Sequence, residues 1–198
     1  MKKEGRVSSC KRKTKETDIE LTLNIDGEGK VKINTGIGFF DHMLTALAVH
    51  GSLDLSLSVK GDLEVDGHHT VEDCGIVLGQ AIKEALGDRS GIARYGGMLV
   101  PMDESLAQVA LDISGRPYLK YDAVFVNQTI GNYDTCLTKE FYAGLVSASG
   151  ITLHIRLLDG GNDHHSTEAI YKAFAHALRQ AAAPRGYSTA LSSKGVLV

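Results

Sequence analysis

One short pattern occurs twice in the sequence, 96 residues apart. The segment HHTVED begins at His68, and the segment HHSTEA begins at His164. After each copy, apolar residues recur at the same offset with spacings of three and four, which is typical of one face of an amphipathic helix. A repeat of this kind within one chain predicts two halves of the same fold, each with a long helix that begins at its histidine pair.

A strand precedes each of these helices. Apolar and polar residues alternate over 53–59 and again over 151–157, at an offset of 98 residues. The same offset relates a helical pattern around Leu44 to another around Tyr142, and alternating strands near Ile19 and Val109 open the two halves. Each half is therefore predicted to run β–β–α–β–α, and the turn at 24–30 is predicted to close a hairpin.

The predicted fold class is α+β, with two tandem-duplicated half-domains that each form a small mixed four-stranded sheet backed by two helices. We place the first half-domain at residues 1–90, the second at 91–183 and a C-terminal tail at 184–198. Gly87 is expected to end the first long helix. Pro184 is expected to end the second, because proline cannot continue a helix.

Composition excludes several classes of function. The chain has 21 Lys plus Arg against 24 Asp plus Glu, for a net charge of −3, whereas nucleic-acid-binding domains are usually basic. No apolar run approaches the roughly 18–20 residues of a membrane span. The three widely spaced cysteines indicate free thiols in a cytoplasmic protein. The basic first 16 residues lack the apolar core of a secretory signal, and we interpret them as a solvated strand, with a nucleic-acid arm as the alternative.

The duplicated histidines indicate a metal centre. In each long helix two His and one Glu stand at i, i+1 and i+4, so the first His and the Glu share a face one turn apart. The repeat also aligns His42 with Glu140. Imidazole and carboxylate ligands suit Mn, Zn, Fe or Ni, and the lack of thiolates argues against a structural zinc site. The eight predicted ligands, enough for two ions, are His42, His68, His69, Glu72, Glu140, His164, His165 and Glu168.

Other interpretations of these residues stay open. The histidine pairs would also serve simply to cap or solvate two helix starts. The remaining histidines, His50, His154 and His176, have no symmetric partner and are expected to be ordinary. Four aspartates flank the ligands and are candidates to accept hydrogen bonds from them: Asp41, Asp66, Asp73 and Asp163. For Asp66 and Asp163, a helix N-cap is an equally good interpretation.

Seven motifs in order make the chain resemble the imidazoleglycerol-phosphate dehydratase family of histidine biosynthesis over nearly its whole length. They are RKTKET from Arg12, GFFDHML from Gly38, HHTVED from His68, PMDESL from Pro101, LDISGRPY from Leu111, GGNDHHSTEA from Gly160 and SSKGVL from Ser192. The resemblance implies a hydro-lyase that assembles as a metal-dependent homo-oligomer of 24 subunits, with active sites between subunits. It also implies two manganese ions (Mn2+) per active site, held at the eight positions named above.

Three positions depart from the family pattern. Glu140 stands where His is frequent, Gly67 stands where Asp is usual, and Ala46 stands where Gln commonly contacts the substrate. A carboxylate can replace an imidazole as a ligand, but it changes metal preference and affinity. Gly67 removes a possible hydrogen-bond acceptor. Neither Gly67 nor Ala46 belongs to the predicted ligand set.

The resemblance implies removal of water from D-erythro-imidazole glycerol phosphate, a small-molecule substrate, to give imidazole acetol phosphate. The proton on the carbon beside the ring is weakly acidic, so the substrate would be bound as an imidazolate between two manganese ions that act as electron sinks. The candidates for moving protons are Glu16, Glu72, Asp103 and Glu168. The candidates for binding the phosphate are Arg94, Arg116, Lys172, Ser192, Ser193 and Lys194.

Simpler roles compete with these. Glu16 pairs equally well with a neighbouring cation, Asp103 fits a turn, and Lys172 fits an i,i+4 pair with Glu168. Two other functions also fit a dinuclear centre. One is a metallohydrolase that uses a metal-bound hydroxide, and the other is a non-catalytic shell whose ions only join subunits. The predicted phosphate-binding set argues against the non-catalytic shell.

Overall fold

The computed structural model describes residues 5–186 and 189–192 of the chain. Its first half begins with strands β1 (Val7–Lys13), β2 (Thr17–Asn24) and β3 (Val31–Asn34). Helix α1 (Gly38–Gly51), strand β4 (Asp54–Gly61) and helix α2 (His68–Leu86) follow. The strands form one sheet in the order β1-β2-β4-β3, in which only β3 and β4 pair in parallel.

The second half repeats this plan. Its sheet has the order β5-β6-β10-β7, and β7 and β10 are its parallel pair. A short antiparallel pair, β8 and β9, is an addition of this half. The fold class is confirmed: α+β, with two mixed four-stranded sheets and four helices. The elements are β5 (Tyr95–Met102), β6 (Ser105–Asp112), β7 (Tyr118–Asp122), β8 (Thr129–Ile130), β9 (Tyr133–Asp134), α3 (Leu137–Ser149), β10 (Thr152–Asp159) and α4 (Asp163–Ala182).

The first half has one strand more than predicted and runs β–β–β–α–β–α. The second half has the same additional strand and also inserts the β8–β9 pair before α3. Strands β3 and β7 were missed because they are short and lack a clear buried alternation. The hairpin predicted at 24–30 is wrong, because β4 lies between β2 and β3. The carboxylate of Asp54 accepts hydrogen bonds from the N–H groups of Glu28 (2.8 Å) and Lys30 (3.0 Å) and so holds this loop across the start of β4.

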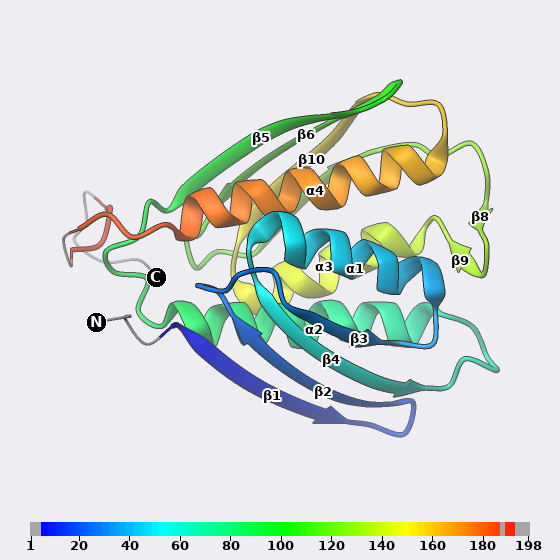
Figure 1. Ribbon diagram of the computed structural model, residues 1–198, viewed down its shortest axis with the longest axis horizontal. Coiled ribbons are helices and arrows are strands. Elements are labelled where there is room, and N and C mark those ends of the chain that lie inside the picture. The colour runs from blue at the N-terminus through cyan, green and yellow to red at the C-terminus, as the bar shows by residue number, and fades with distance from the viewer. Residues whose placement is uncertain (1–4, 187–188, 193–198) are drawn as a thin grey trace.

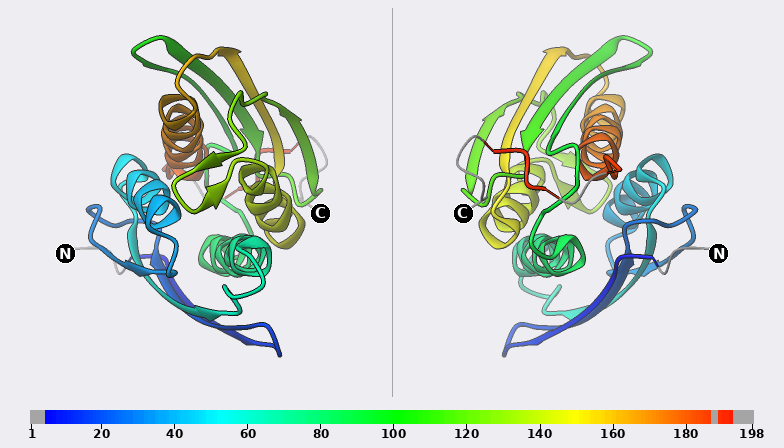
Figure 2. Two further views of the ribbon diagram at one scale, coloured as in Figure 1. Left: turned by 90° about the vertical axis from the view of Figure 1, so that its right-hand side faces the viewer. Right: turned by 90° about the vertical axis from the view of Figure 1, so that its left-hand side faces the viewer.

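The four helices lie between the two sheets, as the end-on views of Figure 2 show. Helix α2 packs on β1 and β2, and α4 packs on β5 and β6. The shorter helices pair across the halves, since α1 packs against α4 and α3 packs against α2. One continuous apolar core therefore joins both halves, with Leu21, Leu47, Phe141 and Leu153 among its fully buried members.

Glycines let α2 and α3 approach closely. A Cβ atom on Gly75 would lie 2.2 Å from the carbonyl oxygen of Phe141, and one on Gly79 would lie 2.3 Å from that of Leu145. Both obstacles are backbone atoms of α3, which cannot move aside as a side chain can. Only a residue without a side chain fits at these two positions of α2.

Other features of the chain follow the sequence-based expectations. Helix α2 ends at Gly87, which has a left-handed φ of +57°, and α4 ends two residues before Pro184. The basic N-terminal segment forms the edge strand β1 from Val7 onward. Among the described residues, no helix has the length and apolar character needed to cross a membrane.

The close contact of α2 and α3 makes a prediction about stability. Gly79→Ala should force the two helices apart and lower the free energy of unfolding by about 1–3 kcal/mol. Thermal unfolding monitored by circular dichroism measures the change. Gly38→Ala is the matched control, because a Cβ there meets no atom within 4 Å, and it should leave stability unchanged or slightly higher. An equal loss in both variants would contradict the steric explanation.

Candidate metal centre

All four helices begin at the same end of the molecule, on the right in Figure 1. This arrangement gathers the eight predicted ligands at that end, because each ligand lies in the first two turns of its helix. Helix α1 carries His42 and α3 carries Glu140, while α2 and α4 carry the two duplicated sets. The parallel orientation of the helices thus brings together residues that lie up to 126 positions apart.

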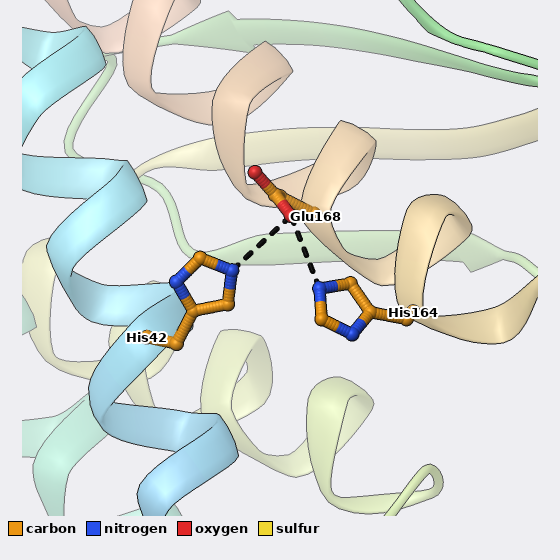
Figure 3. A group of neighbouring side chains, drawn as sticks. All are labelled: His42, His164 and Glu168. Carbon is orange, nitrogen blue, oxygen red and sulfur yellow. Dashed lines mark hydrogen bonds and ion pairs between the residues drawn. The ribbon is translucent and has the colours of Figure 1, made fainter.

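Three of the predicted ligands form a compact group. His42 Nε2 lies 3.2 Å from Glu168 Oε2, and His164 Nε2 lies 3.3 Å from the same oxygen (Figure 3). Their potential ligand atoms all lie within 4.8 Å of one another. The group depends on the packing of α1 against α4, because His42 comes from the first half and the other two residues come from the second. Two imidazole nitrogens and one carboxylate oxygen that converge in this way suit a divalent transition metal.

Glu168 is the most buried member of this group. Its side chain is 10% exposed, and its other oxygen accepts a hydrogen bond from Lys172 Nζ at 2.8 Å. Burial alone would raise the pKa of Glu168, but the hydrogen bond and charge of Lys172, with help from His42, outweigh burial and lower the pKa. The i,i+4 pair that the sequence allowed is therefore present, and Lys172 helps to keep Glu168 ionised.

The second predicted set is looser. His68 Nε2 lies 3.5 Å from Glu72 Oε2 at the start of α2. Glu140 occupies the first turn of α3, which packs against α2 as α1 packs against α4. Among the described residues, however, the Glu140 carboxylate does not complete a three-ligand group with His68 and Glu72.

The remaining two histidines are held by carboxylates through Nδ1. His69 Nδ1 lies 2.9 Å from Asp62, and His165 Nδ1 lies 3.2 Å from both oxygens of Glu104. The hydrogen bond to Asp62 raises the pKa of His69 against the effect of burial. The pKa of Glu104 is lowered to about 2 by the Asn162 N–H, its own N–H and His165. Metal-binding histidines characteristically have such an acceptor on the nitrogen that does not face the ion.

Asp62 and Glu104 were missed by the sequence analysis, and the four aspartates named there have other partners. Asp41 accepts from Thr35, and Asp73 accepts from Arg12 and Thr17. Asp66 accepts from the His68 N–H at 2.7 Å, but it stands one residue before the N-cap of α2, which is Gly67. The N-cap prediction for Asp163 is wrong. Asn162 caps α4, while Asp163 is buried and holds the backbone of residues 126–127.

Two of the four proton-transfer candidates, Glu16 and Asp103, lie in equivalent turns of the two halves. Glu16 is in the turn between β1 and β2, and its Oε1 lies 3.7 Å from His69 Nε2. Asp103 is in the turn between β5 and β6, and its Oδ2 lies 3.8 Å from His165 Nδ1. The other two candidates, Glu72 and Glu168, contact histidines of the ligand set.

Three of the four phosphate-binding candidates in the described residues lie at the opposite end of the molecule. Arg94 donates its backbone N–H to Ala181 in the last turn of α4, and its guanidinium forms two hydrogen bonds with Asp112 and one with the carbonyl oxygen of Leu191. Arg94 is thus buried and anchors the segment that contains Ser192. Arg116 is exposed nearby, before β7. Ser193 and Lys194 lie outside the described residues.

Within one chain, the predicted metal ligands and Arg94 are too far apart to bind the same small substrate. Helix α4 has 20 residues, so its ends lie about 30 Å apart. The duplicated histidines begin this helix, and Arg94 contacts its last turn. Of the described phosphate-binding candidates, only Lys172 lies close to a predicted ligand within the same chain.

Two of the positions that depart from the motif pattern are apolar sites in the structure. Ala46 is buried in α1. A Cβ on Gly67 would meet the methyl groups of Ile37 (3.1 Å) and Leu137 (3.2 Å). Gly67 also lines a cavity of about 370 Å³ that opens beside His68 and includes the exposed Cys136.

The model of the imidazoleglycerol-phosphate dehydratase family matches residues 35–178. The chain belongs to this family. It is therefore an enzyme, a dehydratase, as the motifs predicted. A relative from Desulfotalea psychrophila is 52% identical over 193 residues, which cover 98% of this chain and 97% of the relative. A relative from Acetivibrio thermocellus is 58% identical over 170 residues, which cover 86% of this chain and 87% of the relative.

Solved structures of the family share the fold. The crystal structure of the dehydratase from Staphylococcus aureus is 41% identical, with a TM-score of 0.82, and the match covers 90% of this chain and 99% of that one. The enzyme from Pyrococcus furiosus, solved in complex with (S)-C348, is 38% identical with the same TM-score, covering 95% of this chain and all of that one.

Two histidines outside the ligand set meet between α1 and α4. His50 Nδ1 lies 3.3 Å from His176 Nε2. Burial lowers the pKa of His50, and Lys172 and His176 lower it further, while Glu168 opposes them. The folded chain therefore favours neutral His50.

This contact predicts a pH dependence of stability. A histidine whose pKa is lowered by folding binds more protons in the unfolded state, so its contribution is complete above the unfolded pKa near 6.5 and declines as the pH falls below it. His50→Gln should therefore flatten the fall in melting temperature between about pH 7 and pH 5. His154→Gln, at an exposed position of β10, is the control and should leave that slope unchanged. Identical slopes for His50→Gln and the unmodified protein would contradict the prediction.

Proposed function

We propose that the enzyme dehydrates D-erythro-imidazole glycerol phosphate to imidazole acetol phosphate, a step of histidine biosynthesis in the cytoplasm, and that it uses two manganese ions per active site. Family membership supports the reaction. The chemistry of the residues at the common end of the four helices supports the metal requirement. The observation that carries the proposal is the convergence of His42, His164 and Glu168, because nothing in the fold requires three polar ligand groups there.

The donor set fits divalent ions of manganese type. Five imidazoles and three carboxylates offer nitrogen and oxygen atoms without any thiolate, a mixture that such ions accept. The carboxylates that hold Nδ1 of His69 and His165 leave Nε2 of each ring available for an ion. Structural packing alone would not require both rings to be fixed through the same nitrogen. We assign one ion to the His42 group and the second to the set around His68, Glu72 and Glu140.

We propose that each active site is shared between copies of the chain in a homo-oligomer of 24 subunits. The predicted metal ligands and the anchored segment of Arg94 lie at opposite ends of α4. Imidazole glycerol phosphate is far shorter than this helix, so one chain cannot bind both its ring and its phosphate with these two sets. In this proposal, the predicted metal ligands of one copy, at the start of its α4, meet Arg116 of another copy, which lies near the other end of that helix.

The chain's own residues would divide the chemistry as follows. When bound, the metal ions supply positive charge that draws electrons from the imidazole ring. His42, His164 and Glu168 would hold one ion beside the imidazole ring, while Lys172 and the Arg116 of another copy fix the phosphate. The hydroxyl on the carbon beside the ring takes up a proton and leaves as water, and Glu16 takes the proton from the next carbon. The resulting enol then becomes the ketone by proton transfer.

We assign Glu16 as the base because it is exposed and lies beside His69. Unlike Glu72 and Glu168, it is not one of the predicted metal ligands. Asp103 occupies the equivalent turn but lies on the Nδ1 side of His165, which Glu104 already occupies. The Glu16→Gln variant should therefore lose far more turnover than Asp103→Asn. General acid–base groups typically contribute factors of about 10²–10⁴. Steady-state assays of both purified variants test this order, and a larger loss in Asp103→Asn would reverse the assignment.

A direct assay tests the reaction itself. Protein treated with a chelator should form no ketone from imidazole glycerol phosphate, and added Mn²⁺ should restore its formation. Absence of ketone in both states would refute the dehydratase proposal. Hydrolysis of a phosphate ester by the reconstituted protein would favour the metallohydrolase alternative.

The ligand assignment predicts a change in metal content. His164→Ala should lower bound manganese and reduce the mass of the oligomer, because the metals are proposed to support assembly. Elemental analysis and light scattering after gel filtration measure the two quantities. His154→Ala is the control, since His154 is exposed on β10 and belongs to no proposed site. Unchanged metal content in His164→Ala would contradict the ligand assignment.

Sharing of the sites predicts complementation. Glu16→Gln affects the metal end and Arg116→Ala affects the opposite end, so each variant alone should be nearly inactive. After mixing, dissociation and reassembly, roughly a quarter of the shared sites would carry neither substitution if copies assort randomly. Activity should therefore reappear on mixing. No recovery in oligomers shown to contain both variants would contradict the sharing of sites.

A further inference from the structure

The turn that carries Glu16 is tied internally by Thr14. The Thr14 hydroxyl accepts hydrogen bonds from the N–H groups of Glu16 (3.1 Å) and Thr17 (3.0 Å), and the Thr14 N–H donates to the carbonyl oxygen of Thr17 (2.8 Å). These contacts fix the shape of the turn but not its position over α2. A short turn at the tip of a two-stranded edge is otherwise free to bend with the strands.

A second group of contacts fixes that position. The Thr17 hydroxyl donates to Asp73 Oδ2 at 2.5 Å, and the Arg12 guanidinium forms an ion pair with the same oxygen. Arg12 precedes Glu16 by four residues and Thr17 follows it directly. Thr17 is 2% exposed and Asp73 is 6% exposed, so the bond between them is shielded from water, while the Arg12 side chain remains 32% exposed. Bonds of this kind to a shielded carboxylate are strongly directional.

Asp73 is placed to link the turn to the metal centre. It belongs to α2, the same helix as His69, whose ring lies 3.7 Å from the Glu16 carboxylate. The bonds from Arg12 and Thr17 to Asp73 therefore fix the distance between the Glu16 carboxylate and the His69 ring. Pairing of the strands does not need them, because the register of β1 with β2 runs from Val7 opposite Asn24 to Lys13 opposite Asp18 through backbone bonds.

We propose that Asp73 and Thr17, with Arg12, are positioning residues that hold Glu16 at the distance from the reacting carbon that proton transfer requires. The proposal rests on the assignment of Glu16 as the base. A misplacement of about 1 Å at a reacting group can cost a factor of about 10² in rate. Loss of the Thr17 hydroxyl should therefore lower turnover without altering the ligands or the substrate's own contacts.

Thr17→Val tests this role, because it preserves the shape of the side chain and removes the hydroxyl that donates to Asp73 and also contacts Thr14 and Arg12. We expect kcat to fall by about 10- to 100-fold, with KM, manganese content and melting temperature nearly unchanged. Thr17→Ser retains the hydroxyl and should keep most of the activity. Thr22→Val is the matched control on the same strand, since the Thr22 hydroxyl contacts only Ser9 on the exposed face, and it should behave as the unmodified enzyme.

A double variant separates positioning from general damage. In a Glu16→Gln background, Thr17→Val should cause no further loss of kcat, because there is no longer a base to position. An independent loss of the same size in that background would overturn the proposal, as would equal loss in Thr17→Ser and Thr17→Val. Asp73→Asn offers a second test of the shared acceptor and should show the same dependence on Glu16.

The outcomes also distinguish this proposal from the one on which it rests. If Glu16→Gln retains full turnover, the assignment of the base is wrong. If Glu16→Gln loses turnover while Thr17→Val and Asp73→Asn retain it, only the positioning role is wrong.

Discussion

The packing of helices across the two halves is the constraint on which the rest of the structure depends. Each long helix takes as its neighbour the short helix of the other half. Helix α1 packs against α4, and Leu44, Leu47 and Phe174 belong to one core that both halves share, so neither half can exclude water from this core alone. The same packing places His42 against Glu168. The hydrophobic core and the candidate metal centre therefore form together.

The common direction of the helices has an electrostatic consequence. The N-terminus of each helix carries about half a positive charge, and four such ends gather where the predicted ligands lie. This field attracts an anionic substrate but disfavours cations. Carboxylates offset it locally. Glu168 stays ionised beside Lys172 despite its burial, and Asp62 and Glu104 place further negative charge behind His69 and His165. The net charge of −3 does not reveal that positive helix ends and negative carboxylates lie side by side at this end of the molecule.

The internal repeat and the motifs in the sequence predict the long helices and the candidate ligand positions. The offset between the halves aligned His42 with Glu140 and identified the long helices from their histidine pairs. It could not show that His42 meets Glu168, because an offset reports equivalence rather than contact. Asp62 and Glu104 were missed because Asp62 directly follows strand β4 and Glu104 lies in the turn between β5 and β6, so they are not equivalent under the repeat. Arg94 matched a phosphate-binding position of the family, yet its partner Asp112 became visible only in the structure, where β6 lies beside it.

The separation of the two functional ends along α4 carries a further consequence for assembly. If one copy contributes its histidine end and another its Arg116 end, the contact between them is heterologous, because different surfaces meet. A pair of such copies completes one site and leaves one end of each copy unused. Every site is complete only when the series of subunit contacts closes on itself. Contacts that do not close extend into filaments. Full activity per subunit would then require a closed particle, so that catalysis itself favours a finite shell.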